Sequence, residues 1–344
     1  MKAQSKIQVL LCSVTLICCA HFGGAPVEAA EKYVVPSYAP YNTEPYDRAK
    51  MLGRFNERNK DGKFNAVLDL NVTTGDIPGW DWEAGKTTKA ALPDDVRAKQ
   101  VSDMRFGMFI CWSFGSFGGT EYVKGITDPE FFRATGCDTD NWCKAAKSAG
   151  MKYILFLTKH HDGFCLWDTK TTEFKVTNTK LGMDVLAKLK KSCDKYGLKL
   201  ALYFSEGDWH WAHRKWGRRA SRAAMISLKK AQLQELCTQY GPIEFFWMDH
   251  HAGDGGLSHA ETTKWVHEFQ PNCFMGYNHG QVSGRYMAGE VGSPGKLENT
   301  AGAARMKRTA ARKLAEKELG PKTAKNRDEW NKRAADLART VKWE

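Results

Sequence analysis

The chain has 344 residues, of which 42% are hydrophobic, and its formal net charge at pH 7 is +12. This length and hydrophobic content are enough for one large domain with a sizeable core, or for such a domain with extensions. Seven of the ten cysteines lie beyond the amino-terminal region, and this odd, scattered set excludes a disulfide framework or a zinc ribbon.

The amino terminus has the pattern of a secretory signal peptide. Lys2 and Lys6 precede a mostly apolar stretch at residues 7–20, which is too short to cross a bilayer, and a small-residue cleavage pattern ends at Ala29. We therefore expect residues 1–29 to be removed and the protein to be exported to the periplasm or the extracellular medium. A lipid anchor at Cys19 is the alternative. No other stretch is apolar and long enough to predict a transmembrane helix.

The rest of the chain divides into a leader and a region of alternating strands and helices. Residues 30–100 have little periodicity and predict an irregular leader that wraps around the domain. The predicted strands lie at 106–112, 152–158, 199–205, 243–248 and 273–278, with a weaker one at 286–290. The predicted helices lie at 139–149, 182–196, 222–239 and 259–269.

Strand–helix units of this size predict parallel strands joined by right-handed crossovers. We expect an α/β fold over residues 101–295. A TIM-like (β/α)8 barrel is favoured over a doubly wound sheet, because polar residues follow at least three of the strands. Only about six strands precede residue 296, which predicts a barrel that is incomplete at its carboxyl-terminal end.

Residues 296–344 form a basic tail that carries seven of the twelve net positive charges. Its composition predicts two helices rich in Ala, Lys and Arg, separated at Gly320 and Pro321. A solvated helical extension is the favoured interpretation, and binding to an anionic polymer or a membrane surface is the alternative. No basic platform with interleaved aromatic residues accompanies the tail, so we expect no nucleic-acid partner.

Charged and aromatic residues follow three of the predicted strands. The first apolar run ends in the block KHHDGF at residues 159–164, the second is followed by Glu206 and Asp208, and the third ends in Asp249. The carboxyl ends of parallel strands meet at one edge of a sheet, where such folds place their chemistry. These residues therefore predict one enzyme site built from several loops.

Four segments together resemble the α-L-fucosidase family of glycoside hydrolases. They are RFGMFICW at 105–112, KHHDGFCLW at 159–167, LYFS at 202–205 and GPIEFFWMD at 241–249. The resemblance covers roughly residues 100–294. It implies a (β/α)8-like catalytic domain without metal or cofactor that hydrolyses terminal α-L-fucose with retention of configuration. The implied substrates are fucosylated oligosaccharides or polysaccharides.

Retaining hydrolysis needs one carboxylate as nucleophile and a second as acid/base, about 5–5.5 Å apart. Asp249 is the nucleophile candidate, because it follows an apolar run directly and matches the nucleophile of the family motif. Glu290 is the preferred acid/base because its position resembles that of the acid/base in many members. Glu121, Glu206 and Asp208 are its rivals.

The resemblance also implies a set of sugar-contacting residues. His160 and His161 match a pair that hydrogen-bonds sugar hydroxyls, but neighbours on an extended chain point to opposite faces, so only one is expected to reach the ligand directly. Tyr203 is expected to orient the Asp249 carboxylate, and its alternative is a core tyrosine. The remaining candidates are a pocket wall at Trp112, the Glu-aromatic pair Glu121 and Tyr122, and His279.

Departures from the family pattern leave two alternatives to hydrolysis of this kind. Cys111 replaces a histidine that hydrogen-bonds the sugar, and a thiol is a weak donor. His279, with Arg285 nearby, stands where many members have an arginine. The chain could therefore be a non-catalytic sugar-binding barrel. It could also be a metal-dependent hydrolase, with ligands drawn from the His-rich segments at 160–162, 210–213 and 249–251.

Overall fold

The computed structural model describes residues 46–58, 60–61, 67–250, 254–278 and 301–340. These residues contain a five-stranded, wholly parallel sheet with the order β1-β2-β3-β4-β5. Its strands are β1 (Gly107–Ile110), β2 (Tyr153–Lys159), β3 (Lys199–Ser205), β4 (Phe245–Asp249) and β5 (Phe274–Tyr277). The predicted α/β class is confirmed, and each predicted strand agrees to within two residues at either end. The sixth candidate strand lies outside the described residues.

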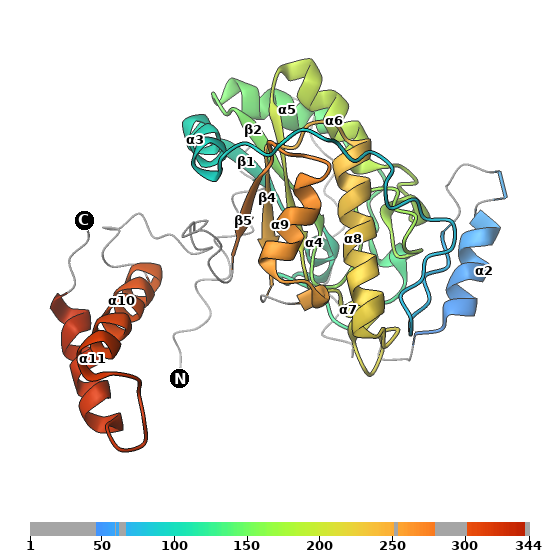
Figure 1. The fold of residues 1–344 in the computed structure, drawn as a ribbon. Coiled ribbons are helices and arrows are strands. Elements are labelled where there is room, and N and C mark those ends of the chain that lie inside the picture. Colours follow the sequence, from blue (N-terminus) through green and yellow to red (C-terminus); the bar gives the residue numbers. More distant parts are fainter. Residues whose placement is uncertain (1–45, 59, 62–66, 251–253, 279–300, 341–344) are drawn as a thin grey trace, which may run out of the picture. The chain divides into compact units, whose positions relative to one another are not determined.

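Helices connect the strands and lie alongside them (Figure 1). The long ones are α5 (Thr139–Ser148), α6 (Val185–Tyr196), α8 (Arg222–Gln239) and α9 (His259–His267). The Asp138 side chain caps α5 by accepting from the Asn141 backbone N–H, and Gly197 ends α6 in the left-handed conformation at φ 63°. Shorter helical segments are α4 (Phe114–Gly118), η1 (Pro129–Phe131), η2 (Val176–Asn178), α7 (Trp209–Ala212) and η3 (Asp254–Gly256).

The two faces of the sheet carry different residues. Right-handed crossovers along a sheet with consecutive strand order place all connecting helices on one face. One face bears Leu202 and Phe246, which pair in register and are fully buried. On the other face the Phe109 ring lies 5.4 Å from the Trp247 ring and 5.9 Å from the Tyr203 ring. Asp249 belongs to this second face, because it lies two residues after Trp247.

The segment predicted to be an irregular leader contains two helices, α2 (Arg48–Arg58) and α3 (Asp94–Met104). In α2, Met51 and Phe55 are four residues apart and both are buried. Residues at this spacing lie on one side of a helix, so they form a narrow apolar stripe. That stripe is the sequence signal that we missed.

The basic tail forms α10 (Ala301–Leu319) and α11 (Arg327–Thr340), which pack against each other. This agrees with the two helices that the sequence predicted on either side of Gly320 and Pro321. Arg333 and Glu318 form an ion pair between the two helices, and Ala311, Ala315 and Trp330 are buried. Among the described residues, no helix is long and apolar enough to cross a membrane.

Candidate active site

Asp249 ends β4 and is almost completely buried, with 4% of its surface exposed. The Tyr203 hydroxyl donates to Oδ2. Oδ1 accepts from Asn278 Nδ2 at 2.9 Å and from the His250 backbone N–H at 2.7 Å. Three donors therefore fix the position of a single carboxylate.

These donors determine the charge of Asp249. Burial alone raises the pKa of a carboxyl, because it disfavours the charged form. Here the hydrogen bonds from Tyr203, Asn278 and His250 outweigh burial and hold the pKa of Asp249 below its usual range. The site therefore contains a buried, ionised carboxylate whose orientation is fixed.

The register of the sheet brings the donors to Asp249. Ser205 of β3 pairs with Asp249, so Tyr203 lies two residues earlier on the same face of the neighbouring strand. On the other side Met248 pairs with Tyr277, and the Asn278 backbone N–H donates to the Met248 carbonyl at 2.8 Å. Asn278 is thus the first residue after β5 and lies level with the carboxylate.

His160 and His161 both lie beside Asp249, and the expectation that only one of them reaches the ligand directly stays a prediction. Their ring centroids are 4.2 Å apart, and both rings lie within 6 Å of the Tyr122 ring. The strict alternation of faces applies within a strand, but β2 ends at Lys159 and its pairing with β3 shifts just before that residue. The two histidines therefore need not point in opposite directions.

His161 is neutral and in a defined tautomer. Burial, followed by the proximity of His160, lowers its pKa to about 3 despite the opposing effect of Asp249, and burial lowers the pKa of His160 to about 4. The Ser205 hydroxyl donates to the Gly207 carbonyl at 2.9 Å, so Ser205 Oγ must accept the 2.7 Å hydrogen bond from His161 Nδ1. His161 Nε2 then carries a lone pair and lies 3.7 Å from Asp249 Oδ2. It presents a hydrogen-bond acceptor beside the carboxylate.

Two rivals for the acid/base role are held in buried ion pairs. Lys159 Nζ lies 3.1 Å from Asp208 Oδ2, and both side chains are almost fully buried. Glu206 pairs with Lys229 and also lies 3.2 Å from His259 Nε2. These contacts hold both carboxylates in ion pairs away from solvent, so neither resembles a group that delivers a proton to a substrate.

The other candidates are distributed as follows. Tyr122 lies beside both histidines, and the neighbouring Glu121 side chain is exposed. Trp112 packs against the Phe132 and Trp142 rings at 4.8 and 5.5 Å, so its role as a pocket wall stays a prediction. Glu290 and His279 lie outside the described residues. Cys111 is exposed just beyond β1.

Within the described part of the chain, one cluster of side chains could hold a metal ion. The donor atoms of His160, His161 and Asp249 lie within 4.8 Å of one another, and two imidazoles with a carboxylate suit a first-row divalent ion. His210, which the sequence offered as another ligand, is buried between Tyr46 and Phe174 and is not part of this cluster.

Three further residues of the site were not predicted from the sequence. Asn278 and Ser205 make hydrogen bonds to Asp249 and His161, respectively. The Trp209 ring lies 5.6 Å from the His161 ring and 5.2 Å from the Tyr122 ring. All three lie at or just after a strand end, which is the signal that had identified Asp249.

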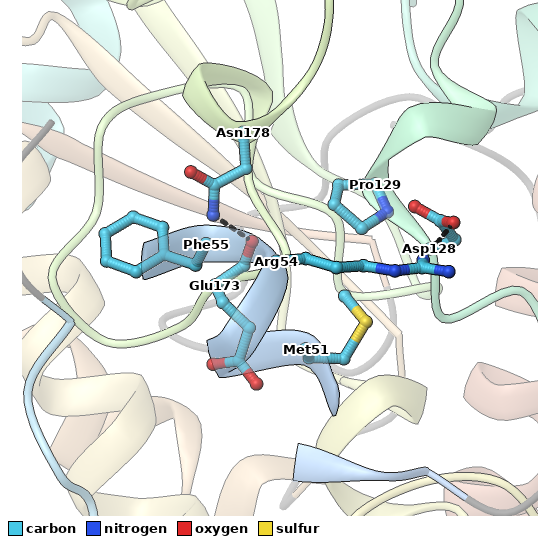
Figure 2. Close-up of a pocket in the computed structure, with 7 residues that line it drawn as sticks. All are labelled: Met51, Arg54, Phe55, Asp128, Pro129, Glu173 and Asn178. Atoms are coloured by element: carbon cyan, nitrogen blue, oxygen red, sulfur yellow. Dashed lines mark hydrogen bonds and ion pairs between the residues drawn. The ribbon is translucent and has the colours of Figure 1, made fainter. Parts of the chain in front are cut away.

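A separate small pocket lies under α2 (Figure 2). Arg54 reaches across it to form an ion pair with Asp128, and Asn178 Nδ2 donates to the Glu173 carbonyl. It has room for about one water molecule, which excludes a sugar ring. The Glu173 carboxylate is buried, and no described residue donates a hydrogen bond to it; such a water would supply a donor.

A parallel α/β domain with an ionised, buried carboxylate among neutral histidines at its strand ends has the arrangement of a glycoside hydrolase. The α-L-fucosidase family model matches residues 119–307, which is just over half of the chain. The chain belongs to the α-L-fucosidase family.

The chain is similar to the following curated proteins and to one solved structure. Alpha-L-fucosidase 1 of Arabidopsis thaliana is 29% identical over 195 residues, covering 55% of this chain and 37% of that protein. Plasma alpha-L-fucosidase of Homo sapiens is 26% identical over 183 residues, covering 44% of this chain and 38% of that protein. A solved glycoside hydrolase 29 family member from an unknown rumen bacterium is 31% identical with a TM-score of 0.46, covering 54% of this chain and 36% of that one. The chain thus spans less than two fifths of each relative's length.

Proposed function

We propose that the protein hydrolyses terminal α-L-fucose from glycans by a two-carboxylate double displacement with retention. The observation that carries this proposal is the Asp249 carboxylate, which is held ionised by three donors and lies beside two neutral histidines. Membership of the α-L-fucosidase family supports the choice of sugar.

In this mechanism Asp249 attacks the anomeric carbon and forms a covalent fucosyl-enzyme, while an acid protonates the departing oxygen. The Asp249 nucleophile must be ionised, and its lowered pKa keeps it so at neutral pH. We assign the acid/base role to Glu290, whose position resembles that of the acid/base in many family members. Glu121 is the alternative, since Glu206 and Asp208 are engaged in buried ion pairs. Because His161 Nε2 carries a lone pair, it would accept a hydrogen bond from a sugar hydroxyl.

The first test is the Asp249→Ala variant with p-nitrophenyl α-L-fucoside. We expect loss of p-nitrophenol release with an unchanged circular dichroism spectrum. Turnover at the wild-type rate would overturn the assignment of Asp249. A screen of aryl glycosides of other sugars tests the specificity, and we expect the highest kcat/KM for the α-L-fucoside.

Chemical rescue by azide separates the two carboxylate roles. In Asp249→Gly, azide should replace the missing nucleophile. In Glu290→Ala, it should attack the covalent fucosyl-enzyme in place of water, because azide needs no general base. The two fucosyl azides should have opposite anomeric configurations, because only the second variant still forms the covalent intermediate. Identical configurations would contradict the two roles.

We also propose that the protein is exported, on the basis of the signal-peptide pattern in residues 1–29. The amino-terminal sequence of the protein recovered from the periplasm or the medium should begin at Ala30. Retention in the cytoplasm with Met1 intact would contradict export.

A further inference from the structure

Two cysteines meet in the core between α5 and α6. Cys143 lies on α5 and Cys193 on α6, and their sulfur atoms are 3.8 Å apart. Both side chains are fully buried, and both are free thiols. The buried thiols of Cys165 and Cys273 donate instead to backbone carbonyls. Cys143 and Cys193 are thus partners of each other.

Polar contacts hold the two helices together beside this pair. The Ser192 hydroxyl donates to Asp140 Oδ1 at 2.6 Å and lies 2.7 Å from the Thr139 hydroxyl. Lys195 forms an ion pair with Asp140. Thr139 and Asp140 begin α5, while Ser192 and Lys195 belong to its partner helix α6. The approach of the two sulfur atoms is therefore fixed by the packing of the helices and does not depend on the cysteines alone.

We propose that Cys143 and Cys193 form a disulfide bond when the protein is exported. This inference rests on the proposed export, because disulfides form and persist in oxidising compartments. The bonded distance is about 2.05 Å, so the two sulfur atoms must approach by about 1.8 Å in total. The bond buries no S–H group and suits the apolar surroundings, which include Ala146 and Leu189. A single bond is also compatible with an odd number of cysteines.

The oxidant is a disulfide of another molecule, such as an oxidised dithiol protein or oxidised glutathione. One cysteine thiolate attacks this disulfide, forms a mixed disulfide and releases the first sulfur of the oxidant. The second cysteine thiolate then attacks the mixed disulfide at the cysteine sulfur and releases the second sulfur of the oxidant. Two electrons pass to the oxidant, and its two sulfurs take up the two protons that the cysteines lose. Because both cysteines are shielded from solvent in the folded chain, we expect the exchange before α5 and α6 finish packing.

The bond would stabilise the segment that carries the two histidines of the site. Cys143 and Cys193 are 50 positions apart, and β2, His160 and His161 lie between them. A cross-link across such a loop restricts the unfolded chain and so favours the folded one. We expect the oxidised protein to have a Tm about 5–15 °C above that of the reduced protein.

The test counts free thiols in the full chain after it has been refolded with oxidised and reduced glutathione. N-ethylmaleimide labels the thiols under denaturing conditions, and intact mass gives the number of labels with and without prior reduction. We expect reduction to add two labels, and peptide mass spectrometry to find Cys143 joined to Cys193. The same count on protein recovered from the periplasm or the medium shows whether the bond forms in the cell.

Three variants serve as comparisons. Cys143→Ala and Cys193→Ala each remove one sulfur, and Cys137→Ser is the matched control, since Cys137 is half-buried just before α5. Reduction should add two labels to Cys137→Ser and none to either alanine variant. The difference in Tm between oxidised and reduced protein should persist in Cys137→Ser and disappear in both alanine variants.

An equal label count before and after reduction of the refolded wild type would overturn the proposal, as would a bond that joins other cysteines. Failure of export alone would give a different result. The protein recovered from cells would then remain reduced in the cytoplasm, while the refolded chain would still form the bond between Cys143 and Cys193. That result would contradict export and support the pair.

Discussion

Removing the Tyr203 hydroxyl should move the acid side of the pH–activity profile. The Tyr203 hydroxyl donates to Asp249 Oδ2, and this bond is one of the three that hold the pKa of the carboxyl below its usual range. The Tyr203→Phe variant keeps the ring, which packs beside Phe109 and His160, and removes only the donor. The variant therefore isolates one hydrogen bond.

The magnitude follows from the charge of the acceptor. A hydrogen bond to a charged group contributes about 1.5–3 kcal/mol, and about 1.4 kcal/mol corresponds to one pKa unit. Losing the Tyr203 hydroxyl should therefore raise the pKa of Asp249 by about one to two units. The nucleophile is active when ionised, so activity that is lost as pH falls through this pKa should be lost at a correspondingly higher pH.

The assay is the pH dependence of kcat/KM for p-nitrophenyl α-L-fucoside between pH 3 and pH 8. The matched control is Tyr153→Phe. Tyr153 is the first residue of β2, at the opposite end of the parallel sheet from Asp249, and packs against Phe245. We expect the acid limb to move to higher pH in Tyr203→Phe and to stay in place in Tyr153→Phe. An unmoved acid limb in a folded Tyr203→Phe variant would refute the view that this bond sets the charge of Asp249.

Three further outcomes are expected. Burial lowers the pKa of His160 from 6.5 to about 4, so the unfolded chain binds more protons between these values and stability falls as pH drops through them. His160→Asn should reduce the pH dependence of the unfolding free energy by about 1.4 kcal/mol per pH unit in this window. An unchanged slope would count against a neutral, buried His160. Glu206→Gln leaves Lys229 buried without its carboxylate, so the free energy of unfolding measured in urea should fall by about 3–5 kcal/mol. Azide should not rescue the activity of this variant, and rescue would make Glu206 the acid/base. Dialysis against EDTA should leave kcat/KM unchanged because the double displacement uses only carboxylates, whereas a loss restored by Zn²⁺ would make His160, His161 and Asp249 a catalytic metal site.

The sequence predicted the sheet well for a physical reason. Strands covered on both faces are nearly continuous apolar runs, and such runs stand out even in a single sequence. The positions of Tyr203 and Asp249 follow from the same signal, because Tyr203 lies within one apolar run and Asp249 ends another. The two helices of the leader were missed because only a few apolar residues, such as Met51 and Phe55, mark their buried side.

Contacts that depend on register or on distant partners could not be predicted in the same way. Asn278 reaches Asp249 because β4 and β5 pair with Met248 opposite Tyr277, and no local pattern specifies that register. Lys159 pairs with Asp208, which lies on a different loop 49 residues away. The placement of both histidines near Asp249 depends on the chain leaving the extended conformation directly after Lys159.

The most direct test of the central claim is covalent trapping with 2-fluoro-fucosyl fluoride, followed by intact-mass and peptide mass spectrometry. We predict one fluorofucosyl group per chain, attached to the peptide that contains Asp249, and no label on Asp249→Ala. A label on another carboxylate, or full turnover of p-nitrophenyl α-L-fucoside without any covalent label, would contradict Asp249 as the nucleophile.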